Sequence, residues 1–390
     1  MTNPETTIVS LQPCNTYDDA AVEARLRQSI EDLGGLDKYI QAGDRVLLKA
    51  NLLMKKKPEE ATTTHPAVVK ALASILIAHG ASVLIGDSPG GPFTEGLLRG
   101  IYAASGMERV ATETGAALNR NTAAFQKANP DGLLLKRIEM TDMLNDVDKV
   151  ITVSKMKTHG MMAFTGAVKN LFGVVPGLIK AEYHLNMPSH TQFADALIDI
   201  CLCVAPVLSF MDGIEAMEGH GPSGGTPRKM NVLLASNDPF ALDKTACAII
   251  GLDEARVPIL TQAEARGICR VGLDGITFAG APWTDFAVRD FDIPETHLVM
   301  NPKELPRFAQ KFVNRFLQPR PVFTRKTCTG CGDCAKCCPA HVIEMRGRNP
   351  YVTLDNCIRC FCCQELCPKN DIKAYRPRLL RTISRPKRKP

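Results

Sequence analysis

Ten of the 15 cysteines of this chain lie between Cys328 and Cys367, and the other five are scattered over the preceding residues. Such local density, in a chain whose first residues carry no export pattern, indicates metal binding rather than disulfides. The dense segment contains the spacing C-x2-C-x2-C-x3-C twice, each time followed by proline. The first run is Cys328, Cys331, Cys334 and Cys338, and the second is Cys357, Cys360, Cys363 and Cys367.

Both runs resemble those of bacterial ferredoxins, in which the fourth cysteine of each run ligates the cluster of the other run. The resemblance implies two [4Fe-4S] clusters with crossed ligands. One cluster takes Cys328, Cys331, Cys334 and Cys367, and the other takes Cys357, Cys360, Cys363 and Cys338.

Only one register satisfies both runs. A shift of the first run would place His341 at its fourth position, and a shift of the second would place Leu366 at its third. Cys337 and Cys362 are left over, and we expect them to be packed side chains. Structural zinc is the alternative, but zinc sites usually draw their ligands from separate pairs.

The rest of the chain has the alternation of an α/β fold. Between about residues 7 and 283, short β-branched runs alternate with segments of helical period, which predicts a mostly parallel, doubly wound sheet. One helix is expected to begin at Pro66 and to end at Gly80. The segments predicted as strands include 45–51, 82–87, 149–155, 207–212 and 230–236.

Composition sets the domain limits. We expect an α/β domain over residues 1–300, with its core at about 44–253, and a proline-bounded linker over 301–322. A small α+β ferredoxin-like module should follow over 323–375. Residues 376–390 carry seven basic side chains and no acidic one, which predicts a disordered, solvated tail rather than a nucleic-acid contact.

Several function classes lack support. A hydrophobic content of 45% is ordinary for a globular chain and excludes the disordered and fibrous classes. No apolar run is long enough for a membrane span, and without an export signal the cytoplasm is the expected location. The chain has no P-loop and no G-x-S-x-G elbow, so NTPase and α/β-hydrolase chemistry have no motif.

Polar residues follow the predicted strands at the edge where doubly wound sheets bind ligands. We expect them to hold a small anionic ligand such as a phosphate or carboxylate, although any one lysine is more often a solvated charge. His159 could also protonate a reduced product. Asp87 and Asp212 could hold a metal or a hydroxyl, or could cap the helices that follow them. The candidate catalytic residues are Lys155, Lys157, His159, Lys169, Asn170, Asp87 and Asp212. The candidate cofactor-binding residues are Lys49, Asn51, Ser88, Gly90 and His184.

A family resemblance rests on several motifs that occur in order. They are GDSPGG, SKMKTHGMMAFTGAVKNLFGVVPG, MDGIEAMEGHGP and SNDPFALDKTA, and together they cover roughly residues 44–253. This stretch resembles the family known as domain of unknown function 362, which is often fused to a ferredoxin module. The resemblance implies an α/β domain, iron-sulfur binding and redox work, with no assigned substrate.

These observations predict an iron-sulfur oxidoreductase that passes electrons from its clusters to a small anionic substrate or cofactor in the α/β domain. An electron donor or acceptor protein is the implied partner, and the oligomeric state stays open. One alternative is a non-catalytic, ferredoxin-like carrier whose large domain docks a partner or binds a regulatory ligand. A second is a redox-insensitive transferase or hydrolase with structural clusters.

Overall fold

The computed structural model describes residues 7–187, 189–270, 272–294, 306 and 318–375. Its centre is a nine-stranded sheet in the order β11-β1-β10-β9-β7-β2-β3-β4, with β8 paired to β7. The strands are β1 (Thr7–Pro13), β2 (Arg45–Ala50), β3 (Ser82–Gly86), β4 (Ala117–Leu118), β7 (Lys149–His159), β8 (Ala163–Phe164), β9 (Leu208–Glu218), β10 (Thr226–Ser236) and β11 (Ile276–Gly280).

Most neighbouring strands run parallel, as the alternating sequence predicted. Strands β4, β3, β2, β7 and β9 form one parallel block. Strand β10 is antiparallel to both β9 and β1, and β11 returns parallel to β1. The predicted α/β class is therefore confirmed, in the form of a mixed sheet that is mostly parallel.

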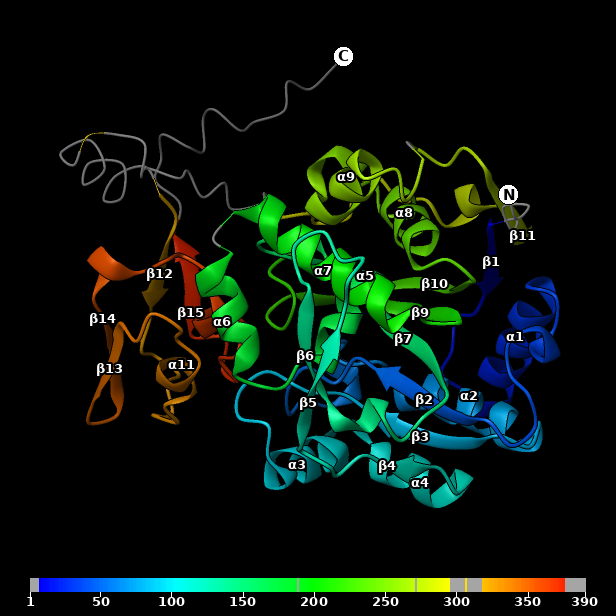
Figure 1. Cartoon of the computed structure of the whole chain (residues 1–390). Helices are drawn as coiled ribbons and strands as arrows, with labels where there is room; N and C mark the ends of the chain where they lie inside the picture. The colour runs from blue at the N-terminus through cyan, green and yellow to red at the C-terminus, as the bar shows by residue number, and fades with distance from the viewer. Residues whose placement is uncertain (1–6, 188, 271, 295–305, 307–317, 376–390) are drawn as a thin grey trace, which may run out of the picture.

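Helices cover both faces of this sheet (Figure 1). Alternate residues of β2 show why: Leu48 packs into the core beneath α1 and α2, whereas Leu47 packs into the core beneath α7. Successive side chains of a strand point to opposite faces, so a strand that is apolar throughout requires two covering layers. The helices are α1 (Asp19–Asp32), α2 (Pro66–Ala78), α3 (Glu95–Ser105), α4 (Met107–Thr114), α5 (Ala167–Asn170), α6 (Ile179–Asn186), α7 (His190–Val204), α8 (Pro239–Ile249) and α9 (Pro258–Ala265).

Helix termini follow their local chemistry. Helix α2 begins at the predicted Pro66, and Gly80 just beyond its end has a φ of +95°, which favours glycine. The Asp238 carboxylate caps α8 by accepting hydrogen bonds from the backbone N–H groups of Phe240 and Ala241. A separate antiparallel pair, β5 (Ala124–Ala128) and β6 (Arg137–Thr141), lies outside the main sheet.

The C-terminal module is built from two short antiparallel pairs and two single-turn helices. Strand β12 (Arg320–Phe323) pairs with β15 (Ile372–Tyr375), and β13 (Ile343–Arg346) pairs with β14 (Asn349–Val352). The helices are α11 (Asp333–Lys336) and α12 (Cys362–Glu365). Its small core consists largely of cysteines with Ile343 and Ile372. In Figure 1 the module, drawn in orange and red, lies beside α6.

Some predicted boundaries are only partly covered by the described residues. Strand β12 begins at Arg320, so the module includes residues that were predicted to be linker. The rest of the predicted linker, apart from Pro306 and residues 318–319, and the basic tail lie outside the described residues and stay predictions. In the described part of the chain, every helix is too short or too polar to cross a membrane.

Candidate active site beneath the cysteine module

Two small cavities in the module are each lined by four of the predicted ligand cysteines. The outer cysteine cavity has a volume of about 380 Å³ and is lined by Cys328, Cys331, Cys334 and Cys367. The inner cysteine cavity has a volume of about 340 Å³ and is lined by Cys338, Cys357, Cys360 and Cys363. Each group contains three cysteines of one run and the fourth of the other, which is the grouping that the ferredoxin resemblance implies.

The spacing of these thiols bears on the kind of metal. Within the described ranges, no three His, Cys, Asp or Glu side chains converge closely enough to hold a single metal ion. A structural zinc site needs that convergence, because its ligands all lie within bonding distance of one atom. A four-iron cluster is a larger body with its thiolates at separate corners. Each cavity therefore offers a set of four thiols, the number that a [4Fe-4S] cluster takes.

A larger cavity lies between the sheet and the module, and we call it the interdomain cavity. Its volume is about 730 Å³, its open mouth included, which falls within the range of small-molecule sites. The large domain contributes residues from the ends of β2 and β3 and from α5 and α6. The module contributes Cys337, Cys362, Glu365 and Leu366.

The two leftover cysteines line this cavity and are next in sequence to residues that line the inner cysteine cavity. Cys337 precedes Cys338, and Cys362 precedes Cys363, so each adjoins a residue that lines the inner cavity. Both leftover side chains are buried. A ligand in the interdomain cavity would thus lie against the part of the module that holds the inner set of four cysteines.

Helix α12 attaches the module to the large domain. Its Glu365 carboxylate lies 3.2 Å from His159 Nε2, and the Ser223 hydroxyl donates a 2.6 Å hydrogen bond to the Glu365 carbonyl. The next residue, Leu366, packs so closely on Gly90 that a Cβ at that glycine would collide with the leucine side chain. A larger residue at position 90 would therefore require the Leu366 side chain to shift.

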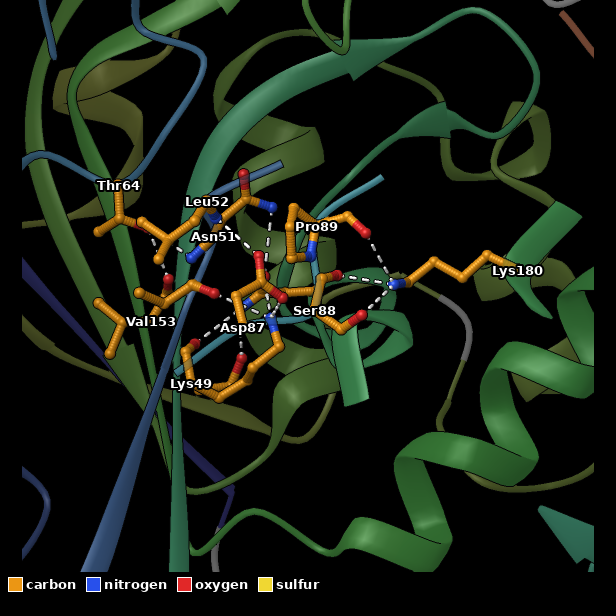
Figure 2. A network of polar contacts seen from close by, with 12 residues as sticks. Lys49, Asn51, Leu52, Thr64, Asp87, Ser88, Pro89, Val153 and Lys180 are labelled. Atoms are coloured by element: carbon orange, nitrogen blue, oxygen red, sulfur yellow. Dashed lines mark hydrogen bonds and ion pairs between the residues drawn. The ribbon is translucent and has the colours of Figure 1, made fainter. Parts of the chain in front are cut away.

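A polar network forms the floor of the interdomain cavity (Figure 2). Lys49 Nζ forms a 2.8 Å ion pair with Asp87 and donates hydrogen bonds to Asn170 Oδ1 and to the Ala50 carbonyl. Burial lowers the pKa of Lys49, and the Asp87 carboxylate opposes that shift. The Lys49 ammonium thus lies among three protein oxygens, and the Asp87 carboxylate balances its charge.

Lys169 differs from Lys49 because, among the described residues, no carboxylate lies within ion-pair distance of its ammonium. It lines the interdomain cavity, and it forms no hydrogen bond or ion pair with any residue that the structure describes. Burial lowers its pKa, and the charge of Glu365 opposes that shift. The turn that carries it is held by Asp243, whose carboxylate accepts hydrogen bonds from the backbone N–H groups of Ala167 and Val168. A held but unpartnered ammonium is suited to bind an anion.

Burial lowers the pKa of both histidines near the cavity. Burial lowers the pKa of His184 to about 4, and its ring stacks on Phe193 at 4.4 Å. His159 Nδ1 accepts hydrogen bonds from the backbone N–H groups of Met161 and Met162, so its proton lies on Nε2, facing Glu365. Burial also lowers the pKa of His159. Although burial raises the pKa of Glu365, His159 and Lys169 outweigh it and bring that pKa to about 2.

The structure brings together most of the residues that the sequence singled out. The predicted residues that line the interdomain cavity are Lys49, Asn51, Asp87, Ser88, Gly90, Lys169, Asn170 and His184. The remaining four lie outside its lining: Lys155, Lys157, His159 and Asp212.

Lys155, Lys157 and His159 were predicted to line the anion site, and Asp212 was predicted to hold a metal or a hydroxyl or to cap a helix; the structure gives these four residues other contacts. Lys155 forms a 2.8 Å ion pair with Asp212 and a hydrogen bond to the Tyr17 hydroxyl, in a separate buried cluster. Lys157 donates hydrogen bonds to Asn51 Oδ1 and to a backbone carbonyl, and His159 lies behind Glu365. The physical reason is that β7 extends to His159 instead of ending at residue 155, so its polar side chains contact neighbouring segments.

Comparison with known proteins agrees with the two-part architecture. Residues 46–248 match the family model described as "Domain of unknown function (DUF362)", and residues 320–368 match the "4Fe-4S dicluster domain". The thylakoid-associated protein sll1697 of Synechocystis sp. is 33% identical over 325 residues, which cover 82% of this chain and 98% of that protein.

A solved structure shows a weaker likeness. The lactate racemase apoprotein from Thermoanaerobacterium thermosaccharolyticum aligns over 61% of this chain and 57% of that chain, at 11% identity and a TM-score of 0.38. A likeness of this size carries no functional argument. The family model and the Synechocystis relative identify the family: this chain belongs to the DUF362 family and is, through its 4Fe-4S dicluster domain, an iron-sulfur protein.

Proposed function

We propose that this protein is an oxidoreductase that delivers electrons from two [4Fe-4S] clusters to a small anion in the interdomain cavity. The observation that carries the proposal is the composition of the cavity wall. One side presents the unpartnered Lys169, and the other presents Cys337 and Cys362, which adjoin ligand cysteines. When bound, each cluster supplies one electron at a time.

The burial of the cysteines suggests a direction for the electrons. Cys331 of the outer cysteine cavity is exposed to solvent, whereas Cys338 and Cys363 of the inner one are buried. The outer set is therefore suited to meet a donor protein, and the inner set to serve the interdomain cavity. Exposed basic residues of the module would favour an acidic donor, whose encounter rate falls as salt screens the charges.

The residues of the large domain would bind and orient the anion. Lys169 would form a charge-assisted hydrogen bond with it, and enclosure beneath the module would strengthen that contact by excluding water. The Lys49–Asp87 pair and Asn170 would keep the floor rigid, because they are already bonded to one another and to the strands of the sheet. Such preorganised groups stabilise charge without reorganising during the reaction.

The direct test is a stoichiometric reoxidation experiment. Protein prepared without oxygen would be photoreduced and mixed with crotonate, pyruvate or nitrite as probe anions, while the visible absorbance of the clusters is followed. We expect at least one probe to reoxidise the wild type, and Lys169→Ala to slow that reaction at least about tenfold. The exposed Lys229→Ala serves as the matched control and should react like the wild type.

The alternatives predict other outcomes. A carrier would be reoxidised by a protein acceptor but by none of the three anions, and this result would overturn the proposal. Clusters that accept no electrons from the photoreductant would instead indicate a structural role. Reoxidation by an anion at equal rates in the wild type and in Lys169→Ala would place the reaction outside the interdomain cavity.

A further inference from the structure

We propose that Ser88 and Lys180 form a proton-delivery pair for the interdomain cavity, so that the acceptor is a small acid with a reducible multiple bond. This inference rests on the proposed function and adds to it. An anion that only collects electrons needs no proton, whereas reduction of a C=C or C=O bond consumes one proton per electron. The cavity wall carries a proton source suited to that need.

Lys180 is bound only by neutral oxygens. Its ammonium donates hydrogen bonds to the Ser88 carbonyl at 2.6 Å, the Ser88 hydroxyl at 3.0 Å and the Pro89 carbonyl at 3.3 Å (Figure 2). It forms no ion pair with a carboxylate in the described part of the chain. Lys49, which lines the same cavity, has the Asp87 carboxylate at 2.8 Å. The charge of Lys180 is therefore held less tightly than that of Lys49.

Ser88 connects this lysine to the cavity. The hydroxyl oxygen accepts hydrogen bonds from Lys180 Nζ and, at 2.8 Å, from the backbone N–H of Gly177. Both acceptor positions of the oxygen are thus filled. The hydroxyl hydrogen has no acceptor among the residues that the structure describes, and Ser88 lines the cavity. This hydrogen is therefore available to a ligand.

The surroundings of Lys180 match proton release near neutral pH. Burial lowers the pKa of Lys180 to about 7, the Asp87 carboxylate opposes the shift, and the ammonium groups of Lys49 and Lys169 add to it. His184 on the same helix is neutral, and Glu365 faces the cavity from α12. A donor is most effective when its pKa lies near the working pH.

Two other acids near the cavity lie against carboxylates. The Nε2 hydrogen of His159 faces Glu365, and the Lys49 ammonium is held by Asp87. Lys169 is free, but it is the group that binds the anion in the proposed function, and proton loss would release that anion. Among the described residues that line the cavity, Ser88 with Lys180 is thus the pair best suited to give up a proton.

For a 2-enoate, the electrons, protons and bonds of the reaction balance. The C=C bond accepts two electrons from the reduced protein and two protons, and a C–H bond forms at each carbon. One proton leaves the Ser88 hydroxyl while the Lys180 ammonium transfers its own proton to the Ser88 oxygen. The serine is restored, the lysine becomes a neutral amine, and water supplies the second proton and later reprotonates the lysine.

The test compares an acceptor that needs protons with one that does not. Reduced Ser88→Ala and Lys180→Arg proteins would be mixed with crotonate or, separately, with ferrocenium, which takes one electron and no proton. We expect crotonate reoxidation to fall about 100-fold in both variants, with ferrocenium reoxidation unchanged. Ser82→Ala, at the exposed opposite end of β3, is the matched control and should behave like the wild type.

The pH dependence of crotonate reoxidation distinguishes a proton donor from a residue with a purely structural role. Because Lys180 must be protonated to act, wild-type crotonate reoxidation should be fast below pH 7 and should fall as the pH rises through about 7. In Lys180→Arg this fall should vanish, since a guanidinium does not lose its proton in this range. A fall at the same pH in both proteins would overturn the inference.

A measurement without any acceptor separates this inference from the proposed function. NMR of the oxidised holoprotein with 13Cε-labelled lysine, assigned through Lys180→Arg, would follow the titration of Lys180 directly. We expect Lys180 to titrate near pH 7. Titration above pH 9 would rule out the proton-delivery pair, regardless of the results with crotonate and ferrocenium. If Lys180 titrates near pH 7 but no anion reoxidises the protein, the proposed function fails instead.

Discussion

Cys363→Ala is expected to reduce the iron content from about eight to about four atoms per chain and to abolish electron delivery to the interdomain cavity. Cys363 lines the inner cysteine cavity, and removal of one of four thiolates leaves an incomplete ligand set. The neighbouring Cys362→Ala is the matched control, because that side chain lines the interdomain cavity instead. Iron and sulfide analysis of protein prepared without oxygen measures both.

The same experiment can contradict the ligand assignment. Loss of iron in Cys362→Ala or in Cys337→Ala would show that a leftover cysteine is a ligand. A wild type that contains about four iron atoms, or zinc at full occupancy, would rule out two clusters. Cys331→Ala should also halve the iron content, but it removes the outer set, so the inner set should still exchange electrons with ferrocenium.

Lys169→Ala is expected to weaken the binding of crotonate to the oxidised protein by about 10- to 100-fold. A charge-assisted hydrogen bond in a partly buried site contributes about 1.5–3 kcal/mol, and Lys169 is the cation of the cavity without a protein partner in the described residues. Equilibrium dialysis with labelled crotonate measures the change, with Lys229→Ala as the unaffected control. Lys169→Arg should retain most of the binding.

Unchanged crotonate binding in Lys169→Ala would contradict the assigned position of the anion. If Lys169→Ala binds crotonate as tightly as the wild type, the anion lies elsewhere. Lys155 would then be the next residue to replace, because it is a second buried lysine and forms an ion pair with Asp212 on the neighbouring strand. A loss of binding in Lys155→Ala alone would move the site to that cluster.

The fold could be predicted because its causes are local. Leu47 and Leu48 lie next to each other in an apolar strand, and such a strand needs a covering layer on both faces. Pro66 and Gly80 delimit a helix through their own backbone preferences. The cysteine runs are equally local, since the spacing within each run suffices to identify a ferredoxin-like module.

The site could be predicted only in part, because its contacts join distant segments. The lysines of β7 lie where ligands are expected, but their partners, Asp212 for Lys155 and Asn51 for Lys157, come from other strands and loops. No local pattern reveals that such a lysine is already neutralised or hydrogen-bonded. Glu365 was missed for the same reason, because its role depends on how α12 packs against the large domain.

The proposed function requires that a ligand in the interdomain cavity lie beside the inner set of cluster cysteines. Electron–nuclear double resonance on the reduced protein tests it, with [1-13C]butyrate as an unreactive probe whose binding is measured separately by dialysis. We expect a weak 13C coupling to a reduced cluster that persists in Cys331→Ala and is lost in Lys169→Ala. Bound butyrate that shows no coupling, or a coupling that survives in Lys169→Ala, would contradict it.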